Sequence, residues 1–308
     1  MKSERMLKAT YLAVIVIWST TPLAVQWSIQ SGMLFGLMSR MSIGLFVLVM
    51  LFVVTKQKLS LHKDAFIAYL TVGLGIYFAM SFVYWSAQYI PSGWISVIFG
   101  LSPIMTGILS IFVLGENHFT ISKTIGMVLG VAGLIVIFHT SAAIDMSVVH
   151  GVLAMVMSTF AHAMSAVLVK RINAPVSGTE STLGGLLIAV PLILVTFLLS
   201  GEKVGEFTAQ SVVSMLYLGA IATAAGFSMY YYILNKLNAI KVSLITLVSP
   251  VCALLLGSLL NDESITISVL IGGGLILSGL ALFEFLGKEA PSKINSANKL
   301  CSVSGKSS

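Results

Sequence analysis

Residues 84–116 read YWSAQYIPSGWISVIFGLSPIMTGILSIFVLGE, and residues 231–263 read YYILNKLNAIKVSLITLVSPVCALLLGSLLNDE. The two stretches align without a gap when the first is shifted by 147 positions. The shift superimposes their least common features, which are Ser102-Pro103 on Ser249-Pro250 and Glu116 on Glu263. Apolar residues coincide easily by accident, but a Ser-Pro pair thirteen residues before a glutamate does not. The sequence therefore contains an internal repeat.

The composition is that of a membrane protein. Of 308 residues, 57% are hydrophobic and 9% are charged, and the mean hydropathy is +1.01. Apolar runs of about 20 residues recur, and each is long enough to cross a hydrocarbon core of about 30 Å. Residues 269–283 are apolar except for Ser278, whereas a barrel strand alternates in polarity over about 10 residues. We therefore expect an all-α polytopic membrane protein.

Ten apolar segments qualify as transmembrane helices. We expect them at residues 9–29, 33–54, 65–87, 93–114, 121–139, 149–170, 181–200, 210–233, 241–260 and 266–286. They divide the chain into a cytoplasmic N-terminus (1–8), two five-helix repeats (9–139 and 149–286) and a disordered cytoplasmic tail (287–308). Because five is odd, the second repeat enters the membrane from the opposite side, so we expect the repeats to be inverted.

The distribution of basic residues gives the orientation. Of the 17 Lys and Arg residues, fifteen fall on the side of the N-terminus, Lys203 alone falls on the other side, and Arg40 lies in the second span. The positive-inside rule then predicts cytoplasmic termini in a bacterial inner membrane. Anionic lipid headgroups account for the net charge of +6, so we expect the lipid bilayer and no nucleic acid as a partner.

Inverted repeats are typical of secondary transporters. The two halves can exchange conformations, which gives inward-open and outward-open states of similar energy. The substrate binds near the middle of the membrane, at the interface between the repeats. This arrangement predicts a carrier of small molecules, present as a monomer or a homodimer.

The repeated motif resembles the EamA family of the drug/metabolite transporter superfamily. The features that carry the resemblance are Ser102-Pro103 through Gly115-Glu116, Ser249-Pro250 through Asp262-Glu263, Trp18-Ser19 and Arg40. Two features depart from the family pattern: Asp262 replaces the usual glycine, and the sixth span has no tryptophan matching Trp18. The resemblance covers nearly the whole chain and implies export of amino acids, related metabolites or toxic compounds, without naming a substrate.

Two repeat-related prolines, Pro103 and Pro250, lie in the middle of predicted spans. Each removes a backbone donor and leaves a carbonyl without its usual partner, and such breaks in lipid face protein or a cavity. The repeat-related residues Ser102, Pro103, Ser249 and Pro250 are therefore candidates for the lining of a central substrate path. The alternative is that they are packing kinks stabilised by neighbouring helices.

Aromatic side chains cluster on the third and eighth spans. Tyr77, Tyr84 and Gln88 follow one another at i, i+7 and i+11, on one helical face that could line a substrate cavity. Tyr230 in the eighth span and Trp18 in the first are further candidates. Alternatively, tyrosines near the ends of spans belong to the aromatic belt at the headgroups.

His162 and Arg40 lie well inside predicted spans, away from their ends. His162 is either a neutral residue packed between helices or a proton-sensing cavity residue. For Arg40 the sequence favours snorkelling to the outer interface, or an ion pair with an outside acid, over a functional role. No span has an Asp or Glu near its centre, so cation–proton antiport is not expected, and flux should depend weakly on pH.

The competing function classes are a membrane-embedded lipid-modifying enzyme and a sensor that does not transport. An enzyme needs clustered acids, bases or metal ligands, whereas the histidines of this chain are scattered without ligand spacing. No phosphate-cradling loop is present in the sequence. We therefore expect no catalytic residue, no metal and no cofactor, and a small organic solute as the substrate.

Overall fold

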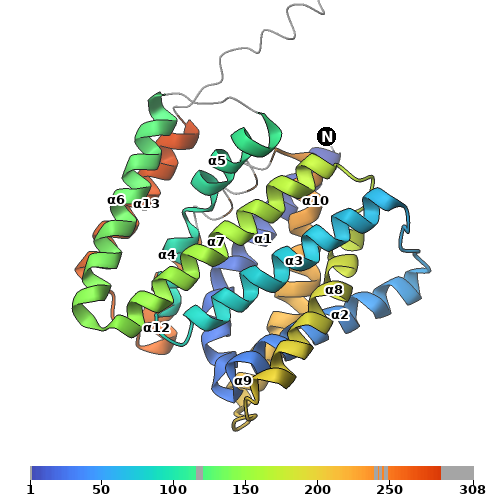
Figure 1. Ribbon diagram of the computed structural model, residues 1–308, viewed down its shortest axis with the longest axis horizontal. Coiled ribbons are helices and arrows are strands. Elements are labelled where there is room, and N and C mark those ends of the chain that lie inside the picture. Colours follow the sequence, from blue (N-terminus) through green and yellow to red (C-terminus); the bar gives the residue numbers. More distant parts are fainter. Residues whose placement is uncertain (1, 116–120, 239–241, 243–244, 246–248, 286–308) are drawn as a thin grey trace, which may run out of the picture.

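The computed structural model describes residues 2–115, 121–238, 242, 245 and 249–285, and within these ranges every regular element is helical (Figure 1). The first half contains α1 (Lys2–Ser28), η1 (Ile29–Ser31), α2 (Met33–Thr55), α3 (Lys63–Ser86), α4 (Ser92–Phe99), α5 (Ser102–Leu114) and α6 (Ile121–Ile144). The second half contains α7 (Met146–Ile172), α8 (Gly178–Ser200), α9 (Ala209–Tyr217), η2 (Leu218–Phe227), α10 (Ser228–Lys236), α12 (Ser249–Asn261) and α13 (Ile267–Phe285). The predicted cytoplasmic tail, 287–308, lies outside the described residues.

Seven described segments are long and apolar enough to cross a membrane: Arg5–Ser31, Met33–Thr55, Lys63–Ser86, Ser92–Leu114, Met146–Ile172, Gly178–Ser200 and Ala209–Lys236. Three further apolar helices are shorter: Thr124–Ile137, Ser249–Asn261 and Ile267–Gly279. The prediction of an all-helical, multi-pass membrane protein is confirmed. The count of ten spans stays a prediction.

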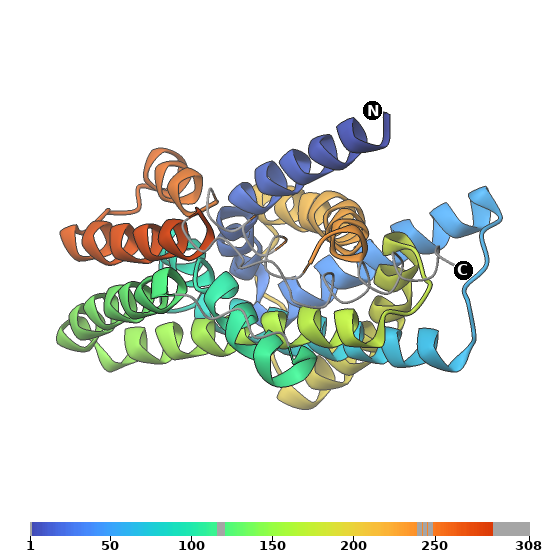
Figure 2. The same cartoon turned by 90° about the horizontal axis from the view of Figure 1, so that it is seen from above.

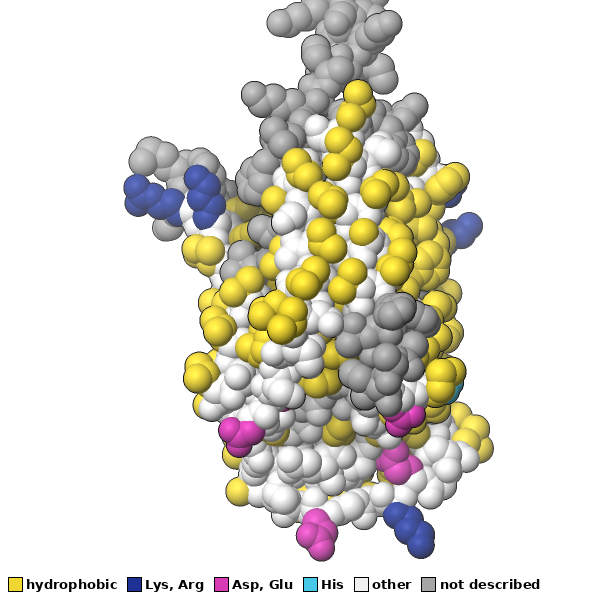
Figure 3. Space-filling model, turned by 90° about the vertical axis from the view of Figure 1, so that its left-hand side faces the viewer, with side chains coloured by type: hydrophobic (Ala, Val, Ile, Leu, Met, Phe, Trp, Pro, Cys, Tyr) yellow, Lys and Arg dark blue, Asp and Glu magenta, His cyan; other side chains and the backbone are white. Residues whose placement is uncertain are grey.

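The surface has the character of a lipid-facing protein. Figure 3 shows a face whose middle is largely apolar, with Lys and Arg near one end and with Asp and Glu, together with a basic side chain, near the other. Large apolar side chains such as Phe112 and Leu199 are 80% and 82% exposed. In a bilayer such side chains contact the acyl chains of the lipid instead of water.

The helices form a central bundle and a separate pair. α6 and α13 pack side by side at one edge of the molecule (Figures 1 and 2). In the bundle, α3 packs on α7 and α8, α2 packs on α8 and η2, and α4 packs on α12. The bundle leaves a cavity at its centre, whereas the pair lies to one side.

Carboxylates cap the ends of several helices. The Glu263 carboxylate accepts hydrogen bonds from Ser92 Oγ (2.9 Å) and Gly93 N (3.2 Å) at the start of α4. Anions are favourable at this position because the first N–H groups of a helix lack partners. Glu263, which is one of the two repeat-related glutamates, therefore caps α4. Its repeat counterpart, Glu116, lies outside the described residues.

The predicted proline break is present in the fourth span. α4 ends at Phe99 and α5 begins at Ser102, with Pro103 in the first turn of the new helix. This is the position that proline tolerates, because the N–H it lacks has no intrahelical acceptor there. In the ninth span α12 begins at Ser249, but residues 246–248 before it lie outside the described residues.

Glycines bring α6 and α13 into close contact. A Cβ atom built on Gly279 would lie 2.5 Å from the Gly126 carbonyl oxygen and 3.0 Å from Gly130 N. One on Gly133 would meet the carbonyl oxygen of Gly272 across the same interface. Small residues are the usual means by which helices approach closely in lipid. These glycines therefore pack the fifth predicted span against the tenth.

We expect Gly279→Ala to lower the free energy of unfolding by about 1–3 kcal/mol, because the helices must separate to admit the methyl group. Gly274→Ala is the matched control on the same helix, since a Cβ atom there has nothing within 4 Å. Thermal unfolding of the purified variants in detergent measures both effects. Equal melting temperatures for the two variants would contradict the packing described here.

Candidate functional site

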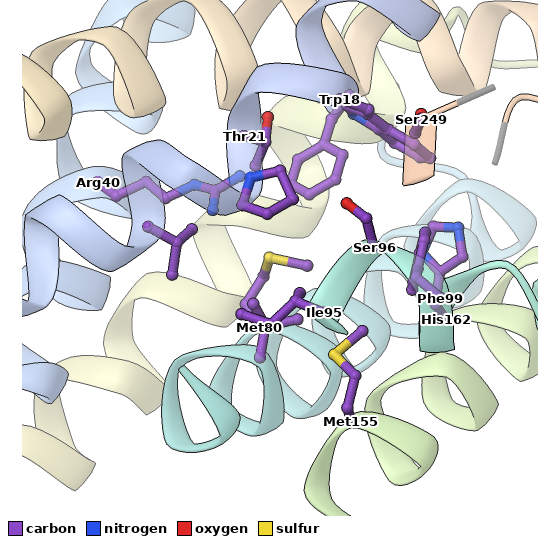
Figure 4. Close-up of a pocket in the computed structure, with 14 residues that line it drawn as sticks. Trp18, Thr21, Arg40, Met80, Ile95, Ser96, Phe99, Met155, His162 and Ser249 are labelled. Carbon is purple, nitrogen blue, oxygen red and sulfur yellow. The ribbon is translucent and has the colours of Figure 1, made fainter. Parts of the chain in front are cut away.

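A cavity lies at the centre of the bundle, between helices of both halves of the chain (Figure 4). The free space between its lining residues and at its open mouth is about 630 Å³, which includes open solvent. The residues that line it are Trp18, Thr21, Pro22, Val25, Arg40, Met80, Val83, Ile95, Ser96, Phe99, Met155, His162, Phe227 and Ser249. A largely apolar lining with a few polar groups is typical of sites for small organic molecules.

Aromatic rings surround one end of the cavity. The Trp18 ring centroid lies 5.0 Å from that of Tyr230, 5.6 Å from His162, 6.1 Å from Phe99 and 6.5 Å from Phe227. We call these five residues the aromatic box. Their edge-to-face and tilted contacts are the arrangements that aromatic quadrupoles favour. The box therefore offers a preformed surface for a flat or branched apolar group.

A cation occupies the other end. Arg40 on α2 is only 2% exposed, and Figure 4 shows its side chain reaching towards Thr21. Its Nε donates a hydrogen bond to Thr223 Oγ1 on η2 at 3.0 Å, whereas its Nη1 has no hydrogen-bond partner. Because this nitrogen is buried and makes no hydrogen bond, it has hydrogen-bonding capacity left for a ligand.

The π-helix η2 supplies residues to both ends. Thr223 holds Arg40, and Phe227, four residues later, belongs to the aromatic box. In a helix with i→i+5 hydrogen bonds, residues four or five apart share a side, and such helices are frequent at functional sites. The close approach of α2 depends on Gly44, where a Cβ atom would lie 2.6 Å from Thr223 Cγ2. The wide helix and the glycine together fix the geometry of the cavity.

Comparison with known proteins identifies the family. Residues 8–139 and 149–285 each match the family described as the EamA-like transporter family. The chain belongs to this family. The resemblance drawn from the repeated Ser-Pro motif is thereby confirmed.

Relatives of this EamA-family chain carry transporter names. The uncharacterized transporter YoaV of Bacillus subtilis (strain 168) is 30% identical over 285 residues, which cover 89% of this chain and 95% of the relative. A chloroplastic WAT1-related protein of Arabidopsis thaliana is 26% identical over 200 residues, which cover 62% of this chain and 48% of the relative. A solved crystal structure superimposes with a TM-score of 0.70 at 18% identity, covering 92% of this chain and 99% of the other. At this identity the likeness shows a shared fold and nothing about function.

The structure brings four of the predicted site residues together. Trp18, His162 and Ser249 line the cavity directly. Tyr230 lies behind them and contacts both Trp18 and His162, at 5.0 and 5.1 Å between ring centroids. These residues come from α1, α7, α10 and α12, so only the tertiary fold makes them neighbours.

The proline motifs flank the cavity without lining it, apart from Ser249. Ser102 and Pro103 are buried at the start of α5. A Cβ atom on Gly100, in the break between α4 and α5, would lie 3.8 Å from Pro250 Cγ. The two Ser-Pro segments therefore approach each other beside the cavity, and their assignment to substrate binding stays a prediction.

Three predicted residues, in or just after the third span, are not among the residues that line the cavity. The Tyr77 hydroxyl pairs with Thr196 Oγ1 on α8 at 2.8 Å, and the buried Tyr84 hydroxyl accepts a hydrogen bond from Ser28 Oγ at 3.2 Å. Gln88 is exposed in a turn beyond the end of α3, where its amide donates to the Trp85 carbonyl. The residues of α3 that line the cavity are instead Met80 and Val83.

Sequence reasoning missed the role of Arg40. Snorkelling to the outer interface, or an ion pair with an outside acid, was the favoured interpretation, and the buried contact with Thr223 shows that it is wrong. Thr223 lies 183 residues away on the other half of the chain, so no local pattern predicts the pair. The signal available was the presence of one arginine inside an apolar span, which by itself marks a functional position.

We expect Thr223→Val to lower the free energy of unfolding by about 1–3 kcal/mol, because it leaves the charged Arg40 Nε buried without an acceptor. Thr55→Val is the matched control, since the exposed Thr55 hydroxyl bonds only the Leu51 carbonyl of its own helix. Its effect should stay within about 0.5 kcal/mol. Thermal unfolding in detergent compares the two, and an unchanged stability of Thr223→Val would show that the contact does not hold Arg40.

Proposed function

We propose that this protein is a secondary transporter that moves a small organic metabolite across the membrane by alternating access. The observation that carries the proposal is the central cavity, which has an aromatic box at one end and Arg40 at the other. An amphipathic solute such as an amino acid or a related compound fits this pairing of polar and apolar groups. Export is the proposed direction.

The helix contacts support a pair of inverted five-helix repeats. α3 packs on α7 and α8, and the segment from α9 to α10 packs on α1 and α2, which is the same contact with the halves exchanged. Three further pairs, α2 with α8, α4 with α12 and α6 with α13, join equivalent helices. This pattern is expected of ten spans related by a pseudo-two-fold axis in the membrane plane. Exchange of conformations between the repeats would open the cavity to each side in turn.

The proposed setting is a bacterial inner membrane with both termini in the cytoplasm. The excess of Lys and Arg on the N-terminal side of the spans supports this orientation. The names of the family and of its relatives point to transport and not to an enzyme. No specific observation favours a lipid-modifying enzyme or a sensor over a carrier.

We further propose that flux is passive and driven by the gradient of the solute. The described residues that line the cavity include no Asp or Glu, which are the groups that commonly make a proton compete with a cationic substrate. His162 is the one histidine among them, and aromatic rings enclose it on three sides. Transport should therefore depend only weakly on pH.

Purified protein in liposomes tests the proposal. The liposomes are loaded with an equimolar mixture of the common amino acids, and mass spectrometry follows each solute in the outer medium at equal pH on both sides. We expect at least one amino acid to leave faster than from protein-free liposomes, with any pH dependence removed by His162→Gln. If no solute leaves faster, the carrier assignment is wrong.

The same liposomes test the coupling. With equal solute concentrations on both sides, an imposed pH gradient should move none of them uphill. Uphill accumulation that persists in His162→Gln would contradict passive flux while leaving the carrier assignment intact.

A further inference from the structure

Arg40 is a buried cation whose described neighbours are neutral. It lies seven residues into α2, about 10 Å from the start of the helix at 1.5 Å per residue. Its Nε bonds the Thr223 hydroxyl, and the Tyr84 hydroxyl also interacts electrostatically with the guanidinium group. Nη1 remains without a hydrogen bond although it is buried. Buried charges are normally paired with an opposite charge, so we expect the guanidinium group of Arg40 to bind an anion.

Three described glutamates accept hydrogen bonds from groups other than Arg40. Glu202 accepts from the backbone N–H groups of Leu34 and Phe35 at the start of α2, at 3.1 and 3.0 Å. Glu180 accepts from Ser60 N and the Tyr69 hydroxyl, and Glu263 caps α4. Among the described residues, none of these acids lines the cavity, and neither does any other Asp or Glu. Within this described lining, the counter-charge of Arg40 is left to a molecule that enters the cavity.

We propose that Arg40 binds the carboxylate of the transported solute through Nη1, while the apolar body of the solute packs in the aromatic box. This assignment rests on the proposed function and names the chemical class of its substrate. Arg40 and Trp18 both line the same cavity, Arg40 reaching in from α2 and Trp18 from α1 (Figure 4). A molecule that pairs with Arg40 and also packs against the aromatic box needs a negative charge at one end and an apolar group at the other.

The chemistry of the lining selects among ligands. Guanidinium binds carboxylates with short, directional hydrogen bonds, and low dielectric surroundings strengthen them. A dianion such as a phosphate ester would meet one arginine and no second cation in the described lining. An organic cation would be repelled by Arg40. The site is therefore suited to a single carboxylate group on an apolar or aromatic body, which organic acids and amino acids share.

Thermal unfolding of the wild-type protein in detergent tests the proposed carboxylate site. The ligands used share one carbon skeleton and differ in their polar groups. The probes are 3-phenylpropionate, its amide, 3-phenylpropylamine and L-phenylalanine. We expect 3-phenylpropionate to raise the melting temperature, because a bound ligand stabilises the native state, and the amide and amine to leave it unchanged. A further shift with L-phenylalanine would indicate that amino acids are also accepted, and its absence would restrict the site to simple carboxylates.

Variants assign the effect to one side chain. Arg40→Gln should weaken the apparent affinity for 3-phenylpropionate by about 10- to 100-fold, the usual effect of losing a charge-assisted hydrogen bond, and Arg40→Lys should restore part of it. Lys203→Gln is the control, because it removes one exposed positive charge away from the cavity. If Arg40→Gln does not fold, the comparison of carboxylate with amide in the wild-type protein still decides the question.

Three results would overturn the inference: equal shifts for the carboxylate and the amide, an unchanged shift in Arg40→Gln, or no shift with 3-phenylpropionate. Each leaves the proposed transport function open to its own liposome experiment. Conversely, a failure of flux with intact carboxylate binding would reject the carrier assignment alone.

Discussion

Inside a bilayer, a polar group must find its partner within the protein, because the surrounding hydrocarbon offers none. Most of this chain meets that constraint with unbroken helices, whose backbone groups bond to one another. The exceptions gather around one place. The break between α4 and α5, the π-helix η2 and the buried Arg40 all adjoin the central cavity. Irregular backbone at membrane depth is tolerated where it is enclosed by protein or lines a cavity.

The cavity joins the two halves of the chain. α1, α2, α3 and α4 supply one part of its lining, and α7, η2 and α12 supply the other. Arg40 links the halves directly through Thr223, and Trp18 does so through His162 and Tyr230. A rearrangement of one half against the other would therefore change both ends of the cavity together. That coupling is what a carrier needs if substrate binding is to influence which side is open.

Part of this site could be predicted from sequence. The repeat, the apolar spans and the one histidine well inside a predicted span are signals along the sequence itself, and they indicated Ser249 and His162. The family resemblance added Trp18. The rotation of each helix about its own axis is not local, because it depends on which neighbours pack against it. Apolarity on all sides of α3 left that rotation undetermined, so Tyr77 and Tyr84 were grouped on the cavity side although they bond to α8 and α1. The π-helix likewise has no signature in the residues 218–227.

The central claim is that the solute passes through the cavity. Ser96 lines it and is 4% exposed, so we would place a single cysteine there in a protein whose native Cys252 and Cys301 are replaced by serine. Solute efflux from liposomes is then measured before and after reaction with N-ethylmaleimide. The account predicts that the adduct at Ser96→Cys stops efflux, that the transported solute slows the reaction, and that Ser258→Cys retains efflux. Full efflux from protein that is completely modified at Ser96→Cys would contradict it.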